Sequence, residues 1–347
     1  MRSFLSLALL CSLVTANPVV KQNAAIKART DQSKPPAGAI VVDATGAVPG
    51  SFKTVQAGAN ALTNHTTATQ TLFIMAGTYN EQVYLRPLKS ALVVQGQTAH
   101  PESYESNTVT IIMNLNRNTR ATNDETATVR NWVANSKFYN INMENNAGHP
   151  ATLSQNIVIS AQAPNQGYYG CQFIGYQDNI LAQNGTQLYA KSKIVGVVDF
   201  IFGTGGKVWF EQVDIRTFAI KGYITASGRL SADSDAWFVI NNSTIAARDN
   251  DVNPGSTYLG RPWKEYSRTV FQKTEMSNVV NPAGWSQWNA TLPNTAHSYL
   301  AEYGNTGPGA ARTGRAAFAK QLSAPITIEA VLGPKWKTAS YVDTTYM

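Results

Sequence analysis

The chain has 347 residues, of which 43% are hydrophobic and only 14% charged, so it is long enough to bury a large core. A formal net charge of +7 would suit an acidic polysaccharide, a nucleic acid or an anionic membrane as partner. The Lys and Arg residues are scattered and form no nucleic-acid-binding motif, and no internal apolar run could span a bilayer, which excludes nucleic acid and membrane.

The N-terminus is typical of a secretory signal. A basic residue precedes an apolar run over residues 4–14, and the small residue Ala16 ends a cleavage pattern. We therefore expect residues 1–16 to be removed, residues 17–33 to form a trimmed or disordered leader, and residues 34–347 to form one catalytic domain. The sequence thus predicts a secreted, extracellular protein.

Glycosylation acceptors and cysteines agree with secretion. Five Asn-X-Ser/Thr triplets begin at Asn64, Asn184, Asn241, Asn242 and Asn289. Because Cys11 leaves with the signal, the mature chain keeps only Cys171 and forms no internal disulfide. Secreted proteins without disulfides need a large regular core, and we expect Cys171 to be buried in that core as a small hydrophobic residue.

Two short segments are predicted to protect the ends of the fold. Residues 51–62 place apolar side chains at helical spacing after Ser51, which is a plausible N-cap. An amphipathic helix there would cover one end of a stack of strands, where exposed edges invite aggregation. Residues 326–332 are expected to help shield the other end.

Short strands account for most of the remaining chain. Apolar and β-branched runs bounded by Gly, Asn and Asp occur at residues 39–43, 72–75, 91–94, 109–113 and 237–240. A large residue is followed five positions later by Ile or Met in six places: Phe138 and Met143, Tyr169 and Ile174, Tyr189 and Ile194, Phe210 and Ile215, Ile240 and Ile245, and Phe271 and Met276. The steps between these starts are 31, 20, 21, 30 and 31 residues, which is typical of a solenoid with loop insertions. The pattern predicts an all-β fold, a right-handed parallel β-helix with a short capping helix, and disfavours a doubly wound α/β sheet.

The same repeat predicts a site. Asp178 and Asp199 each precede a repeat start by 11 residues, and Arg261 precedes one by 10. Equal phase on successive coils would place the two carboxyl groups roughly 4.8 Å apart, the spacing of paired strands. Two carboxylates that close cannot both ionise cheaply, so one pKa should rise, and Arg261 is the expected cation beside the pair.

Other catalytic classes find little support. There is no Gly-X-Ser-X-Gly motif, and the four histidines, His65, His100, His149 and His297, lack metal-ligand spacing. Gly307, Gly309 and Gly314 do not lie between a strand and a helix, so no nucleotide-binding motif is indicated. Carboxylate chemistry without a metal or cofactor is therefore expected.

Ordered motifs in the chain resemble those of one enzyme family. They are Gly77-Thr78-Tyr79-Asn80-Glu81, Gly175-Tyr176-Gln177-Asp178, Gly196-Val197-Val198-Asp199-Phe200-Ile201-Phe202-Gly203 and Leu259-Gly260-Arg261-Pro262-Trp263. Together they are similar to the signature blocks of pectin methylesterases, carbohydrate esterases that release methanol from methylated homogalacturonan. The resemblance covers roughly residues 38 to 340, and it implies the single-stranded, pectin-lyase-like form of the solenoid.

The resemblance implies a role for each matching residue. Asp199 would be the nucleophile that attacks the ester carbonyl, and Asp178 would act first as acid and then as base. Gln177 and Gln155 would donate hydrogen bonds to the oxyanion, and Arg261 would hold Asp199 ionised.

Aromatic residues are expected to bind the polymer. Phe202 and Trp263 would form a floor for stacked sugar rings, while Trp288 and Tyr303, with Trp285, would form walls or simply pack. The chain departs from the usual family pattern at Asn156, Asn179 and Leu181, which leaves the preferred methylation pattern open.

Several alternatives remain at this stage. A pectin or pectate lyase would share the fold and substrate, and a retaining glycosidase also uses carboxyl groups about 5 Å apart. A non-catalytic solenoid could bind pectin through charge and aromatic rings. We expect a monomer, because a capped solenoid presents no open sheet end.

Overall fold

The computed structural model describes residues 32–149, 152, 154–218 and 221–347. The predicted signal and all but two residues of the predicted leader lie outside these ranges. Gln32 is buried and forms an antiparallel bridge with Thr98, so the domain includes residues that the sequence analysis assigned to the leader.

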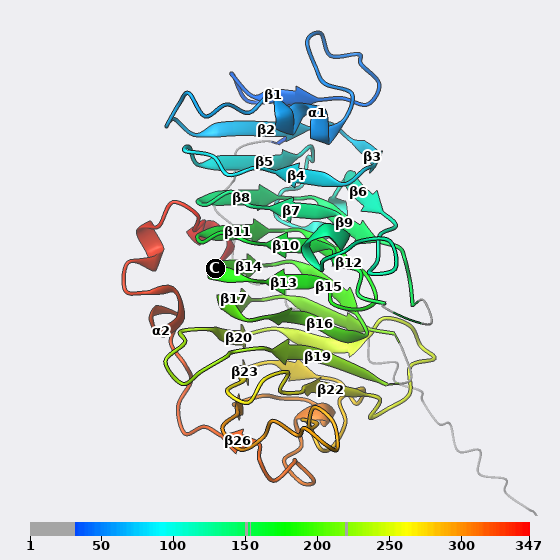
Figure 1. Cartoon of the computed structure of the whole chain (residues 1–347), viewed down its shortest axis with the longest axis vertical. Coiled ribbons are helices and arrows are strands. Elements are labelled where there is room, and N and C mark those ends of the chain that lie inside the picture. The colour runs from blue at the N-terminus through cyan, green and yellow to red at the C-terminus, as the bar shows by residue number, and fades with distance from the viewer. Residues whose placement is uncertain (1–31, 150–151, 153, 219–220) are drawn as a thin grey trace, which may run out of the picture.

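The fold is a parallel β-helix, as predicted, in which three sheets run along the length of the molecule (Figure 1). In the described part of the chain, an 11-stranded sheet, here called the long sheet, contains β1 (Ile40–Val42), β2 (Gln70–Ile74), β5 (Leu92–Gly96), β8 (Ser136–Tyr139), β11 (Gln166–Tyr169), β14 (Asn184–Ala190), β17 (Gly205–Glu211), β20 (Trp237–Asn241), β23 (Arg268–Gln272), β25 (Tyr299–Tyr303) and β26 (Lys320–Gln321).

The other two sheets complete each coil. The middle sheet contains eight described strands: β3 (Gly77–Asn80), β6 (Val109–Met113), β9 (Asn142–Asn145), β12 (Gln172–Ile174), β15 (Lys193–Gly196), β18 (Asp214–Thr217), β21 (Thr244–Ala247) and β24 (Glu275–Met276). The site sheet contains seven: β4 (Val83–Leu85), β7 (Val129–Asn131), β10 (Ile159–Ala161), β13 (Ile180–Ala182), β16 (Val198–Gly203), β19 (Gly222–Ser227) and β22 (Thr257–Gly260). The chain passes from the long sheet to the middle sheet and then to the site sheet, and the five predicted runs all fall on strands.

The register confirms the repeat and corrects one of its members. Phe138, Tyr168, Tyr189 and Phe210 are successive partners in the long sheet, and their rings stack inside the solenoid 4.6 to 5.1 Å apart. The second repeat therefore starts at Tyr168 and not at Tyr169. Because neighbouring residues of a strand face opposite sides, the Tyr169 side chain lies on the outer face, where its hydroxyl donates to the Tyr341 carbonyl.

Helix α1 (Val55–Asn60) covers the N-terminal end of the stack, where it packs against β1, β2 and β4 (Figure 1). Its N-cap is Thr54 and not Ser51, because the Thr54 hydroxyl accepts the Ala57 N–H while Ser51 bonds to Val48. Glu81 follows β3, and its carboxylate accepts the first two helical N–H groups, from Val55 and Gln56. This side chain therefore caps the helix a second time.

We expected residues 326–332 to help shield the C-terminal end of the stack, but helix α2 (Ile328–Leu332) does not lie there. It packs on the outer face of the long sheet against β14 and β17, and lies at the side of the stack in Figure 1. The C-terminal segment with Trp336, Tyr341 and Tyr346 covers the same face. That face carries aromatic and aliphatic residues in place of the usual polar ones, and the segment buries them. Short 3₁₀ helices occupy Tyr104–Ser106, Asp124–Thr126, Pro308–Ala310, Trp336–Thr338 and Thr344–Tyr346.

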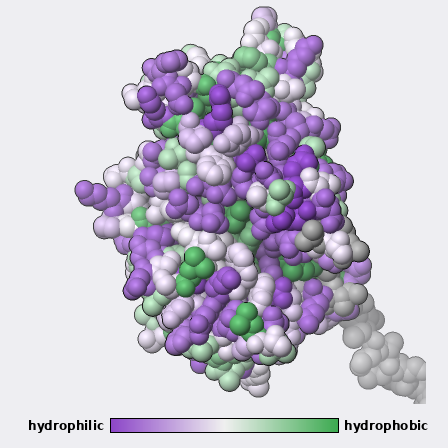
Figure 2. Space-filling view, viewed as in Figure 1, coloured by the Kyte–Doolittle hydropathy of each residue, from purple (hydrophilic) through white to green (hydrophobic). Residues whose placement is uncertain are grey.

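Other features of the surface and core follow the sequence. Cys171 is buried, and burial raises the pKa of its thiol to about 12, which makes it inert as predicted. Asn241 and Asn242 both donate to Glu211, but of the five glycosylation acceptors only Asn241 is buried, whereas the other four are exposed. The face shown in Figure 2 is mostly hydrophilic with small hydrophobic groups. Among the described residues, no helix is both long and apolar enough to cross a membrane.

Candidate active site

Asp178 and Asp199 lie side by side on adjacent coils. Gln177 pairs with Val198 and Ile180 with Ile201, so a constant offset of 21 residues places the two aspartates opposite each other, about 4.8 Å apart along the sheet. The backbone N–H of Asp178 donates to the Val198 carbonyl at 3.0 Å. This juxtaposition is the one that the phase of the repeat predicted.

The backbone of both aspartates is left-handed, with φ of 64° at Asp178 and 50° at Asp199. Aspartate tolerates this region better than most residues, but the conformation still costs free energy and is often retained at functional sites. Asp178 lies two residues before β13, and Asp199 is the second residue of β16, so both stand where the chain enters the site sheet.

A β-bulge at Asp199 sets the direction of its side chain. Val198 pairs with Tyr223, but Ile201 pairs with Thr225, so β16 contains one residue more than β19 between these pairs. In a regular strand Asp199 and Phe202 would face opposite sides, because they are three residues apart. The additional residue lets Phe200 and Ile201 both join the inner core, while Asp199 and Phe202 both belong to the outer face.

Arg261 forms a two-pronged ion pair with Asp199. Its Nε and Nη2 donate to Oδ1 and Oδ2 of Asp199 at 2.9 and 2.7 Å. Arg261 follows β22, two strands along the sheet from β16, so its side chain reaches back across β19. The guanidinium lies 4.1 Å from the ring centre of Tyr223 and 4.3 Å from that of Trp288, and these two rings hold it in place.

Burial and charge separate the two carboxyl groups. Burial and, next, the neighbouring Asp199 raise the pKa of Asp178 well above its usual value, against a smaller opposing effect of Arg261. Burial also raises the pKa of Asp199, but the hydrogen bonds and charge of Arg261 oppose that rise. Asp178 therefore holds a proton up to a higher pH than Asp199, and the pair contains one acid and one anion over the range between the two pKa values.

Gln177 is oriented by two neighbours from the preceding coil. The Ser154 hydroxyl donates to the side-chain Oε1 of Gln177, which leaves its Nε2 as the available donor. The Asn156 Oδ1 accepts the backbone N–H of Gln177 at 3.0 Å, and the Asn156 Nδ2 donates to the Gly148 carbonyl. Asn156 is fully buried, so it joins the loop at Gly148 to the segment that carries Gln177.

Gln155 lies beside Asn156 on the same coil and is half-buried. Its side-chain Oε1 is buried without a hydrogen-bond partner among the described residues, so the amide is not held in a structural network there. The two glutamines thus belong to adjacent coils next to the carboxyl pair.

An apolar patch extends from the pair along the outer face of the site sheet. Phe202 is in register with Leu181 and Ala226, and Trp263 and Trp288 pack against this row. The rings of Phe202 and Trp263 are 6.1 Å apart. Gly228 lies directly against Trp263, because an added Cβ would come within 2.4 Å of the indole Cε3.

The structure does not bring Tyr303 to this patch. Tyr303 ends β25 in the long sheet, at the corner that leads into the middle sheet, whereas both aspartates enter the site sheet. Trp285 is likewise no wall: it is buried in the inner core, edge-on to Phe271. Of the two roles left open for these residues, packing fits Trp285, while Tyr303 lies away from the patch, because the sequence does not reveal which of three sheets carries an aromatic residue.

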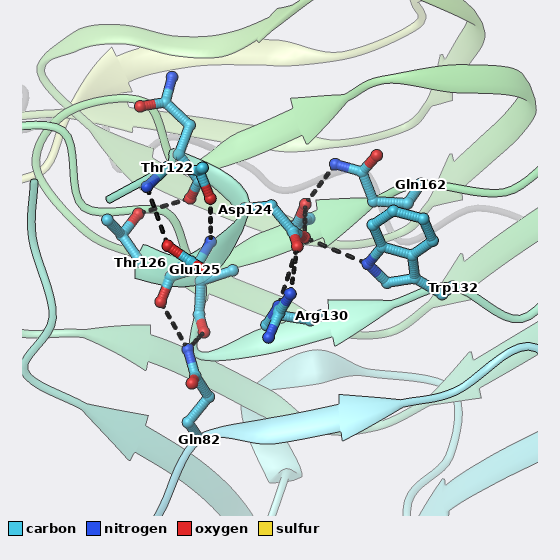
Figure 3. Close-up of polar contacts among 11 residues, drawn as sticks. Gln82, Thr122, Asp124, Glu125, Thr126, Arg130, Trp132 and Gln162 are labelled. Atoms are coloured by element: carbon cyan, nitrogen blue, oxygen red, sulfur yellow. Dashed lines mark hydrogen bonds and ion pairs between the residues drawn. The ribbon is translucent and has the colours of Figure 1, made fainter. Parts of the chain in front are cut away.

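A polar network borders the patch on its N-terminal side (Figure 3). Asp124, in the loop before β7, accepts hydrogen bonds from Arg130, Trp132 and Ser160. Ser160 pairs with Leu181 of the patch, so the network continues the same row of outward residues. Nearby, Gln82 donates to the Glu125 and Ala127 carbonyls and fixes the loop to the sheet (Figure 3).

Three residues that shape the site were not predicted from the sequence: Ser154, Tyr223 and Asp124. The signal for Tyr223 was present, because it pairs with Val198, next to Asp199, and with Tyr258, three residues before Arg261. Ser154 and Asp124 lie in loops and carry no periodic signal. Among the described residues no group of three or more His, Cys, Asp or Glu side chains could hold a metal ion.

Comparison with known proteins agrees with the motifs. A family model described as Pectinesterase matches residues 39–329. A pectinesterase of Aspergillus niger is 46% identical over 315 residues, which cover 90% of this chain and 93% of that protein. The crystal structure of a pectin methylesterase from Aspergillus niger has a TM-score of 0.82 at 32% identity, and covers 90% of this chain and 99% of that one. The carrot pectin methylesterase has a TM-score of 0.78 at 30% identity, with 89% and 98% covered. The chain therefore belongs to the pectinesterase family, whose members hydrolyse the methyl esters of pectin.

Proposed function

We propose that this pectinesterase cleaves the methyl ester of galacturonate residues through a covalent intermediate on Asp199, with Asp178 as acid and then base. The observation that carries the proposal is the in-register pair of buried carboxyl groups, only one of which has an ion-pair partner among the described residues. An anion and an acid held side by side are what a nucleophilic cleavage with a protonated leaving group requires.

In the first half of the reaction, a carboxylate oxygen of Asp199 attacks the ester carbonyl carbon and a tetrahedral oxyanion forms. When it collapses, the bond to the methoxy oxygen breaks, and Asp178 transfers its proton to that oxygen to form methanol. The product on the enzyme is an anhydride between Asp199 and the galacturonate.

In the second half, Asp178 is a carboxylate and takes a proton from water as the water oxygen attacks the galacturonate carbonyl. The anhydride bond breaks, Asp199 leaves as a carboxylate, and Asp178 is again protonated. The sum is one ester and one water converted to one acid and one methanol.

Gln177 and Gln155 supply the oxyanion donors in this proposal. An amide N–H stabilises the developing charge without adding a cation that would lower the pKa of Asp178. The Ser154 bond to Oε1 of Gln177 supports the assignment, because it leaves the nitrogen of that amide to donate. Arg261 keeps Asp199 ionised and aims its carboxylate, and Phe202, Trp263 and Trp288 form the surface for the sugar rings.

The test is an assay on highly methylated pectin that follows methanol release, unsaturated product and new reducing ends together. We expect methanol without chain cleavage; unsaturated product would indicate a lyase, new reducing ends a glycosidase, and no signal a binding solenoid. Asp199→Asn should abolish methanol release while polymer binding persists. Normal turnover by a folded Asp199→Asn variant would overturn the nucleophile assignment.

Secretion and a monomeric state belong to the same proposal. The predicted signal in residues 1–16 supports export, and N-terminal sequencing of the protein from culture medium should find a start after Ala16. Light scattering of the purified enzyme should give the mass of one chain; the mass of a dimer would contradict that part.

A further inference from the structure

A basic groove lies beside the active site, at the corner between the site sheet and the long sheet. It has a volume of about 500 Å³ and is lined by Arg229, Ala232, Trp237, Tyr266, Arg268, His297, Tyr299 and Lys320. Three cations and four aromatic or imidazole rings therefore surround one cavity. We call it the basic groove.

Residues of the groove are close neighbours in the chain of residues in the apolar patch. Arg229 follows Gly228, on which Trp263 packs, and Tyr266 is three residues beyond Trp263. The backbone N–H of Arg268 donates to the Oγ atom of Ser227, and Ser227 is the last residue of β19 in the site sheet. A polymer chain leaving Trp263 in this direction would next meet the groove.

Two of the cations are held over aromatic rings. Among the described residues, neither Arg268 nor Lys320 forms an ion pair or a side-chain hydrogen bond. Arg268 instead lies 3.4 Å over the ring of Trp237, and Lys320 lies 4.9 Å over the ring of Tyr299. Stacking fixes the positions of both cations without using their N–H donors.

The remaining charges fit the same picture. Arg229 is anchored by backbone carbonyls, at 2.7 Å from Ser234 and 3.4 Å from Tyr266, and also donates to Ala232. Burial and, next, the charge of Arg229 lower the pKa of Arg268, against opposing effects of Tyr299 and Asp235. Two acids lie at its border: Glu265 is 3.6 Å from His297, itself a lining residue, and Asp235 is 3.4 Å from Lys207.

We propose that the basic groove is a second binding site, which takes de-esterified galacturonan while the catalytic pair acts on methylated residues. Each turnover turns a neutral ester into a carboxylate, so the product is the polyanion that Arg268 and Lys320 can pair with. The stacked rings of Tyr266 and His297, 5.2 Å apart, form an apolar wall for the sugar rings between the carboxylates. Methylated stretches lack the charge and bind here weakly, so the groove retains the part of the polymer that has already reacted.

A binding experiment without turnover tests the site. An unmethylated galacturonate decamer should be titrated calorimetrically into the mature enzyme and into the double variant Arg268→Gln/Lys320→Gln. We expect about tenfold weaker binding by the variant, equivalent to about 1.4 kcal/mol. A control variant, Lys335→Gln/Lys337→Gln, removes two charges elsewhere, one of them 5.6 Å over the ring of Trp336, and should bind like the wild type.

The outcomes separate the groove from its rivals. Equal weakening in both double variants would show attraction by net charge alone and would overturn the proposal. Unchanged binding by the groove variant, with loss in Trp263→Ala, would place the anion in the catalytic cleft and would also overturn it. Because the decamer has no ester, this result does not depend on the assignment of Asp199.

A second measurement links the groove to catalysis. The groove variant should keep the wild-type rate on a fully methylated trimer, which is too short to occupy both sites. On pectin that is already half de-esterified, its kcat/KM should fall about tenfold. An unchanged kcat/KM on that substrate would contradict a role for the groove in retaining the polymer.

Discussion

Removal of Arg261 should cost stability in a way that depends on pH. The Arg261→Ala variant leaves the carboxyl group of Asp199 buried without its cation and with both hydrogen bonds lost. The Asp199 side chain is 6% exposed and that of Arg261 19%, so solvent screens the pair little. Breaking such a pair typically costs about 3–5 kcal/mol when the remaining group stays charged.

Protonation of Asp199 can relieve part of that cost. Burial holds the folded pKa of Asp199 above its unfolded value even with Arg261 present, so the folded state loses stability as pH rises through that pKa. Without Arg261 the folded pKa lies higher still, and the loss with rising pH is larger. The difference in unfolding free energy between wild type and variant should therefore be small at pH 4 and approach about 3–5 kcal/mol at pH 8.

Urea unfolding followed across this pH range measures the difference, and methanol release measures the activity that we propose for Asp199. Arg315→Ala is a matched control, because Arg315 forms a second two-pronged, buried ion pair, with Glu302, away from the site. It should lose stability but keep its turnover number at a temperature where it is folded. An Arg261→Ala penalty that is equal at pH 4 and pH 8 would refute the reasoning, because Arg261 would then act through packing alone.

Three further outcomes are expected. Ser154→Ala should lower kcat about tenfold with little change in KM. This loss is smaller than the roughly 100- to 1000-fold loss that follows removal of a whole oxyanion donor. Ser154→Thr should restore kcat if the hydroxyl orients Gln177. Gly228→Ala should raise KM for pectin several-fold at a nearly constant kcat, because the added methyl displaces Trp263; an unchanged KM would show that this ring does not contact substrate. Asp178→Asn should abolish methanol release. Because the pKa of Asp178 is raised in the folded state, the wild type loses stability as pH rises, whereas the variant has no such group. The unfolding free energy of the variant, measured in urea, should therefore rise relative to that of the wild type between pH 5 and pH 8.

Much of the fold could be predicted because it is repetitive. The aromatic column through Tyr189 and Phe210 recurs every coil, so an error at one member, Tyr168 read as Tyr169, leaves the others unaffected. The ends of the solenoid have no such support. Helix α2 was misplaced because its apolar face fits an outer sheet face as well as a sheet end, and only tertiary contacts distinguish the two.

The proximity of Asp178 and Asp199 could be predicted for the same reason, whereas the surroundings of the pair could not. Asp178 and Asp199 share a phase, and phase becomes proximity in a solenoid. Ser154 and Asp124 reach the site from loops, where spacing in sequence does not determine position in space. Tyr303 shows the converse: it was named as a wall of the site, but it lies on a different sheet.

The unequal strand lengths at β16 constrain how this enzyme can change. Removing Phe200 would restore an even match with β19 and leave Asp199 and Phe202 on one face by ordinary alternation, but it would take a fully buried ring out of the inner core and leave a cavity there. Insertions in the connecting loops carry no such penalty, since each coil is independently anchored to its neighbours. Variation among relatives should therefore accumulate in loop length, while this one irregular strand keeps its residue count.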